Sequence, residues 1–125
     1  MEDIFDIIKE TFNSLWSVKK YGKTIEIVTP LFTTNDCFVS IFVTERNGRY
    51  IVTDGGWISD SYYNNFFDND DEYYQKLFTF YKERYLINET ESKSRTYYFK
   101  STDKKELVPN IAFEMTSFIS AVVSS

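Results

Sequence analysis

Histidine is absent from the 125 residues of this chain, and cysteine occurs once. Without histidine the chain has no Ser-His or Cys-His nucleophile pair, and it lacks the commonest general base and zinc ligand. The one cysteine, Cys37, lies inside an apolar run, so we expect a buried, unreactive thiol. A single cysteine also excludes a disulfide framework, which is typical of proteins from a reducing compartment.

The sequence also has no long apolar run and no excess of positive charge, and we expect no secretory leader. The N-terminus begins with acidic residues and an amphipathic pattern, and no apolar run reaches the roughly 18 residues that span a membrane. With a formal net charge of −5, the protein is not expected to bind duplex DNA or an anionic membrane directly. We therefore expect a cytoplasmic protein, and the motifs indicate no cofactor.

Aromatic residues, by contrast, are plentiful: 12 Phe, 10 Tyr and 2 Trp, or 19% of the sequence. The length fits one domain over residues 1–125, and a hydrophobic content of 42% is enough for a core. A small core has little room for so many rings, and tyrosine tolerates water at its polar tip. Two interpretations stay open: tyrosines half-buried around the core, or an aromatic surface that binds a partner.

The N-terminal half predicts a helix followed by three strands. Residues 3–17 carry apolar side chains at helical spacing. The strands, which alternate in the manner of a pleated sheet, are predicted over residues 23–29, 37–45 and 49–53. Asn47 and Gly48 indicate a tight hairpin, because both central residues of a type I′ turn need a positive φ. Pro30 is expected to end the first strand or to place it at an edge.

The C-terminal half predicts three helices and a second hairpin. The helices are expected over residues 57–67, 72–86 and from 108 onward, and the hairpin strands over 87–90 and 95–100. Pro109 suits the first turn of the last helix. The order α-β-β-β-α-α-β-β-α then predicts an α+β fold, with a mainly antiparallel sheet of about five strands and helices on one face.

Part of this pattern resembles a known family. Thr29-Pro30-Leu31-Phe32 follows a strand, Tyr50 to Gly56 closes a hairpin, and an apolar helix ends the chain. This combination resembles DUF1828, a small bacterial and phage domain of unknown function. Gly55 stands where the family often has a second Asp, and Leu31 interrupts its Thr-Pro-Phe triplet. The resemblance implies a bacterial or mobile-element source and supplies no catalytic residues.

Carboxylates are the remaining candidates for chemistry. Glu26 and Asp54 flank the predicted sheet core, with Lys23 or Asp36 in support. A metal-dependent phosphodiesterase or nuclease-like enzyme would use two or three acids and a nearby lysine on adjacent strands. The Glu-x-Lys pair expected on one strand is missing, and no metal site is predicted. This enzyme is therefore kept as the alternative function.

Asp54 also has a structural interpretation. Its side chain can accept hydrogen bonds from the amides of Gly55, Gly56 or Trp57 and so organise the turn after the strand. The two glycines could instead cradle a phosphate. However, no Lys and Ser/Thr follow them, and Asp54 would repel an anion, so nucleotide binding is a weak alternative.

The segment from Trp57 to Tyr85 interleaves rings with acidic side chains. Such a surface suits a basic protein partner, since Arg and Lys stack on rings and pair with carboxylates. The candidate partner-binding residues are Trp57, Tyr62, Tyr63, Asp68, Asp70, Asp71, Tyr73 and Tyr74. The sequence therefore predicts a non-enzymatic protein-binding or regulatory module, acting for example on a nucleic-acid-handling or defence protein. A homodimer through the aromatic helices or a sheet edge is a further alternative.

Overall fold

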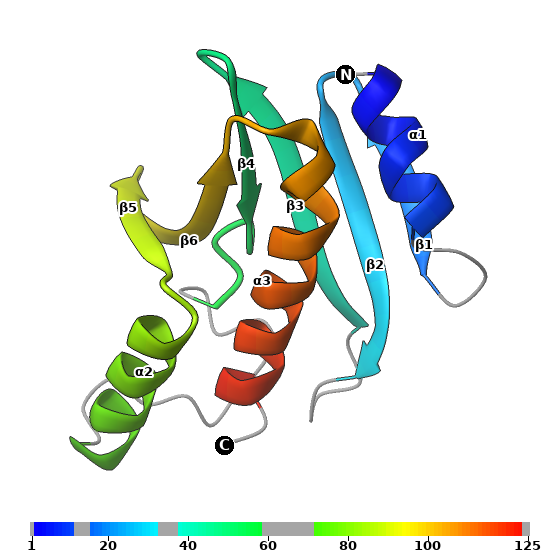
Figure 1. Ribbon diagram of the computed structural model, residues 1–125. Coiled ribbons are helices and arrows are strands. Elements are labelled where there is room, and N and C mark those ends of the chain that lie inside the picture. Colours follow the sequence, from blue (N-terminus) through cyan, green and yellow to red (C-terminus); the bar gives the residue numbers. More distant parts are fainter. Residues whose placement is uncertain (1, 12–15, 33–37, 59–71, 124–125) are drawn as a thin grey trace.

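The computed structural model describes residues 2–11, 16–32, 38–58 and 72–123. Its helices and strands, in chain order, are α1 (Glu2–Thr11), β1 (Ser17–Tyr21), β2 (Thr24–Phe32), β3 (Phe38–Arg46), β4 (Arg49–Thr53), α2 (Glu72–Arg84), β5 (Asn88–Ser92), β6 (Arg95–Thr102), the short 3-10 helix η1 (Lys105–Leu107) and α3 (Val108–Val123). The strands form one antiparallel sheet in the order β1-β2-β3-β4-β6-β5 (Figure 1). The predicted α+β class is confirmed, with six strands in place of about five.

The additional strand is β1, which lies between the first predicted helix and the first predicted strand, in residues that overlap that helix only at Ser17. α1 ends at Thr11, and residues from Ser17 onward pair with β2 as the edge strand β1. Gly22 makes the reversal between the two strands at a φ of +58°, which glycine adopts without strain. Ladder hydrogen bonds to β2 decide the conformation of this segment, and no local spacing in the sequence reveals them.

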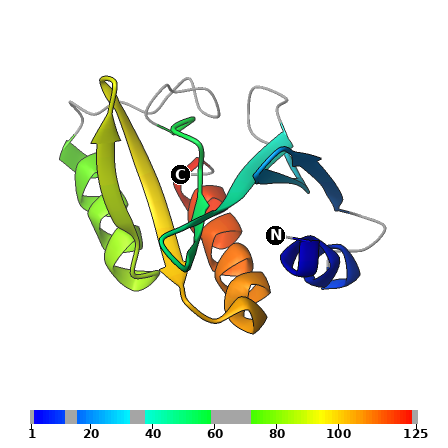
Figure 2. The ribbon, with the colours of Figure 1, turned by 90° about the horizontal axis from the view of Figure 1, so that it is seen from above.

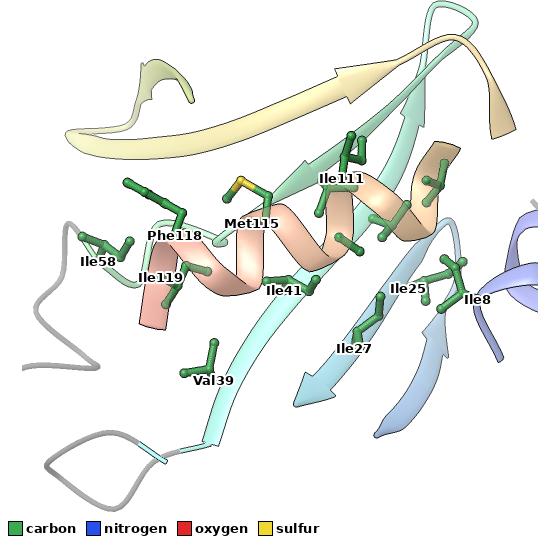
Figure 3. Close-up of a cluster of buried hydrophobic side chains, with 14 of the residues drawn as sticks. Ile8, Ile25, Ile27, Val39, Ile41, Ile58, Ile111, Met115, Phe118 and Ile119 are labelled. Atoms are coloured by element: carbon green, nitrogen blue, oxygen red, sulfur yellow. The ribbon is translucent and has the colours of Figure 1, made fainter. Parts of the chain in front are cut away.

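The core is the layer between α3 and the centre of the sheet (Figure 3). Ile25, Ile27, Val39, Ile41 and Val43 alternate along β2 and β3 and are all fully buried. An apolar stripe of α3 packs against the sheet. It consists of Ile111, Ala112, Met115, Phe118, Ile119 and Val122, all buried. The helical segment Lys105–Val123, which comprises η1 and α3, is apolar and long enough to resemble a membrane span, but this stripe packs on the sheet as a core helix does.

The described helices all lie on the same face of the sheet (Figure 2). α3 crosses β3, β4 and β6, while α1 and α2 lie on either side of it. α2 is anchored by Phe78, whose ring meets Tyr98 of β6 and Phe118 of α3 edge-on, with centroids 5.1 and 5.8 Å away. No helix of the described residues lies on the opposite face. In each strand, the side chains that alternate with the core residues point to that face.

Two further expectations have mixed outcomes. Asn47 and Gly48 do make the tight turn of the β3–β4 hairpin, with φ of 54° and 76°. Pro30 does not end β2, which runs on to Phe32 with a register shift after Val28. A bulge of this kind accommodates a residue that cannot donate to the ladder. Of the helix predicted over 57–67, residues 55–58 form a turn, and those from 59 lie outside the described part.

Candidate binding surfaces

Asp54 organises the turn that follows β4. It is fully buried, and its Oδ1 accepts hydrogen bonds from the amides of Gly56 and Tyr98, both at 3.0 Å. Its Oδ2 accepts one from the amide of Ile58 at 3.1 Å. The Asp54 amide in turn donates to the carbonyl of Tyr98 at 3.1 Å. These bonds join the turn to β6, so the side chain takes the structural role that was one of its two interpretations.

The electrostatics of Asp54 follow from this burial. Desolvation raises the pKa of the carboxyl above its ordinary value, although the amides of Tyr98, Gly56 and Ile58 and the hydroxyl of Thr53 act to lower it. Both oxygens already accept hydrogen bonds, and no part of the side chain is exposed. A substrate or metal ion therefore has no access to this carboxylate as it stands.

The two glycines after Asp54 let the turn lie close against neighbouring side chains. A Cβ on Gly55 would stand 2.6 Å from the ring of Phe42, and one on Gly56 would clash with the side chain of Arg95. Their amides donate to Thr53 Oγ1 and to Asp54 Oδ1. Because these amides are already engaged, the turn does not offer them to a phosphate.

Glu26, the other acid of the predicted catalytic pair, stands apart from Asp54. It lies half-buried on β2, while Asp54 follows β4, and β3 runs between the two strands. Two strand spacings correspond to about 10 Å, too far for one metal ion to bridge. Among the described residues, no group of three or more acids, cysteines or histidines could hold a metal ion.

A groove of about 490 Å³ crosses the face of the sheet opposite the helices. We call this face the groove face. The groove is lined by Thr44 and Arg46 of β3, Ile51 and Thr53 of β4, Tyr97 and Phe99 of β6, and Thr90 and Ser92 of β5. The register places these side chains together, since Thr44 pairs with Ile51, Thr53 with Phe99, and Thr90 with Tyr97. Two rings and one isoleucine thus form an apolar floor among hydroxyl groups.

A second aromatic surface lies on α2. Tyr73 is 69% exposed and Phe80 is 55% exposed. The two are spaced i and i+7 along the helix, so they share one side, which we call the outer stripe. Leu86 follows the helix with 74% of its surface exposed and a φ of 56°, a conformation that costs a non-glycine residue about 1 kcal/mol.

Three of the predicted partner-binding residues fall within the described residues. Tyr73 is exposed, Tyr74 is half-buried with its ring edge-on to Tyr73, and Trp57 is half-buried with its ring edge-on to Phe42 at 5.8 Å. The rest of the predicted set, namely Tyr62, Tyr63, Asp68, Asp70 and Asp71, lies outside the described residues, as do Asp36 and Cys37.

Sequence reasoning missed the groove and half of the outer stripe. Strand alternation alone would have placed Tyr97 and Phe99 on one face, but the register that pairs Phe99 with Thr53 of β4 is a tertiary property. The i, i+7 spacing of Tyr73 and Phe80 was visible in the sequence. Comparison of the chain with models of protein families, with curated proteins and with solved structures found no match.

Proposed function

We propose that this protein is a non-enzymatic binding module that docks a protein partner on the outer stripe of α2. The observation that carries the proposal is the exposure of Tyr73 and Phe80, two large rings on one side of a helix whose opposite side is anchored in the core by Phe78. Exposed aromatic residues on a rigid element are the usual anchors of protein interfaces, because they bury a large area at little conformational cost.

The surroundings of the stripe support a protein partner. Lys76 and Arg84 are exposed on the same side of α2, and Glu72 and Glu83 lie at its two ends. Mixed charges around an apolar centre form the polar rim that protein interfaces have. The acidic residues that precede α2 in the sequence favour a partner with basic groups.

The structural role of Asp54 supports a non-enzymatic activity. The carboxylate that was the best catalytic candidate is fully buried and hydrogen-bonded to three amides, and Glu26 lies two strands away. The resemblance to DUF1828 adds the proposed setting: the cytoplasm of a bacterium, with a phage or mobile element as the source. A nucleic-acid-handling or defence protein is the partner class we propose.

Site-specific photo-crosslinking tests the proposal directly. A photoreactive phenylalanine analogue replaces Phe80, which is 55% exposed, or Tyr21 of β1, which is 57% exposed and serves as the control. The protein is then irradiated in a bacterial lysate. We expect one protein to crosslink at position 80 and not at position 21. Tyr73→Ala should weaken that crosslink at least tenfold, as loss of an interface anchor does. Equal labelling at both positions, or none at position 80, would contradict the proposal.

A further inference from the structure

The groove face differs from the rest of the molecule in its charge. The protein carries a net −5, yet the charged side chains that the strand register places on this face are Lys19, Arg46, Arg49 and Arg95 against Glu26 among the described residues. The acids Glu45, Glu89 and Glu91 occupy the alternate positions and belong to the other face. An acidic protein therefore presents one basic sheet face.

Two of these cations oppose each other directly. Arg46 and Arg49 are register partners across the β3–β4 hairpin, so both side chains leave the sheet on the same side. Like charges in opposed positions destabilise a strand pair. The guanidinium of Arg49 donates to the hydroxyl of Ser101 at 3.3 and 3.1 Å. Because this hydroxyl is neutral, the hydrogen bonds do not neutralise the positive charge of Arg49. Both side chains are exposed, and Arg46 also lines the groove. An anion bound between them would remove the repulsion.

The floor of the groove adds ring faces to this charge. Tyr97 and Phe99 occupy alternate positions of β6 and so stand about 7 Å apart along one strand. Arg95 precedes them on the same face, and Arg46 stands at the β3 side of the groove. Flat rings between cations match the two parts of a nucleotide, because bases stack on aromatic rings while guanidinium groups bind phosphate.

We propose that the groove face binds single-stranded nucleic acid, with bases stacked on Tyr97 and Phe99 and phosphates held by Arg46 and Arg49. This site is separate from the outer stripe of α2 and does not depend on it. A duplex is a poor fit, because its bases are already stacked, and its rigid rows of phosphates would approach the acidic remainder of the protein. At physiological salt, screening over about 8 Å weakens repulsion from those distant acids, so contacts made within the groove dominate.

The position of the groove also disfavours an acidic peptide. A peptide strand gains most of its affinity by adding to a sheet edge, where N–H and C=O groups are free. The groove floor is built on β4 and β6, which each have a paired strand on both sides. Their backbone groups are taken up in the ladders, so a peptide would find only side chains there, whereas stacked bases need no backbone partner.

Fluorescence anisotropy tests the proposal with labelled homopolymer strands of about ten nucleotides, a usual site size for such platforms. RNA and DNA single strands, the matching duplex and an oligoglutamate peptide of equal charge are compared. We expect either single strand to bind at least tenfold tighter than the duplex and the peptide. Binding should weaken with salt, with a slope in log affinity of about −1.4 for two phosphate contacts.

Variants then assign the binding to the groove. Tyr97→Ala and Phe99→Ala should each weaken binding about tenfold, and Arg46→Ala should reduce the salt slope by about 0.7. Tyr97→Leu and Phe99→Leu replace the alanine variants if those lose their fold, since leucine keeps apolar volume without a flat ring. Phe113→Ala, on α3, is the matched control at an exposed ring outside both proposed surfaces and should bind like the parent protein.

Three outcomes would overturn the proposal: no binding of either single strand by the folded protein, ring variants that bind like the parent protein, or tighter binding of the oligoglutamate peptide. The crosslink at position 80 is measured on Tyr97→Ala as well. If it persists while oligonucleotide binding is lost, the two surfaces act separately, and failure at one is distinguished from failure at the other.

Discussion

The two faces of the sheet are made from the same strands and have opposite chemistry. On the helix-covered face, the central residues of β2 and β3, from Ile25 to Ile27 and from Val39 to Val43 in alternation, are aliphatic and fully buried. On the groove face, Ser40 is buried, but Glu26, Phe42, Thr44 and Arg46 each keep part of their surface exposed. The buried centre of the first face can serve stability alone, because no solvent reaches it. The second keeps rings, hydroxyls and cations accessible, which costs burial and leaves groups available for binding.

The largest expected difference in stability is between removing a ring from the helix-covered side and removing one from the groove face. Phe118 is fully buried among Phe78, Tyr85 and Tyr98, so Phe118→Ala should lower the free energy of unfolding by about 3–5 kcal/mol. Phe99 is half-buried on the groove face, and Phe99→Ala should cost about 1 kcal/mol. Urea denaturation of both variants measures the difference. Similar losses would mean that the groove face is as much a part of the core as the helix-covered face.

An intermediate effect is expected at Asp54, which joins β4 to β6. Asp54→Asn turns a donor toward the amide of Ile58, while its remaining oxygen can still face the amides of Gly56 and Tyr98. One buried donor left unsatisfied should lower the free energy of unfolding by about 1–3 kcal/mol. Chemical denaturation at neutral pH checks this value, with Asp103→Asn, an exposed residue, as the control.

Comparing the parent protein with Asp54→Asn at several pH values tests the pKa of Asp54. Burial raises its folded-state pKa above the ordinary 3.8, so the folded state binds the proton more tightly than the unfolded state. The contribution of this group to stability is therefore complete below pH 3.8 and is lost as pH rises through the raised value. The stability of the parent protein relative to Asp54→Asn should fall over this interval. A relative stability that rises with pH would mean that the amide hydrogen bonds outweigh burial.

The smallest effects are expected at two turn glycines, Gly55, which lies close to a neighbouring ring, and Gly48, which does not. Gly55 and Gly48 both have positive φ, 72° and 76°, but a Cβ on Gly55 would meet Phe42 whereas one on Gly48 meets nothing within 4 Å. Gly48→Ala should therefore cost about 1 kcal/mol for the backbone alone, and Gly55→Ala about 1–2 kcal/mol more. Thermal unfolding monitored by circular dichroism compares the two. Equal losses would show that the Phe42 ring moves aside freely.

Local patterns were enough to predict much of the fold. The alternation of β3 and β4, the Asn47-Gly48 turn between them and the Pro109 start of α3 are each set by neighbouring residues, so short-range sequence predicts them. α2 was predicted to within two residues for the same reason. The turn-forming role of Asp54 was also available, because an aspartate before glycines bonds nearby amides.

The tertiary structure decided what depends on residues distant in the chain. β1 exists because β2 offers it a ladder. Only its first residue, Ser17, fell within the predicted helix, and no element was predicted for the rest. The bond from the Tyr98 amide to Asp54 spans 44 positions, and the register of β6 against β4 sets Phe99 opposite Thr53, in the groove that Ile51 and Tyr97 also line. Sequence by itself determined which side chains alternate along each strand. Only pairing between distant strands determined which of them share a surface, because register is a long-range choice that no local spacing encodes.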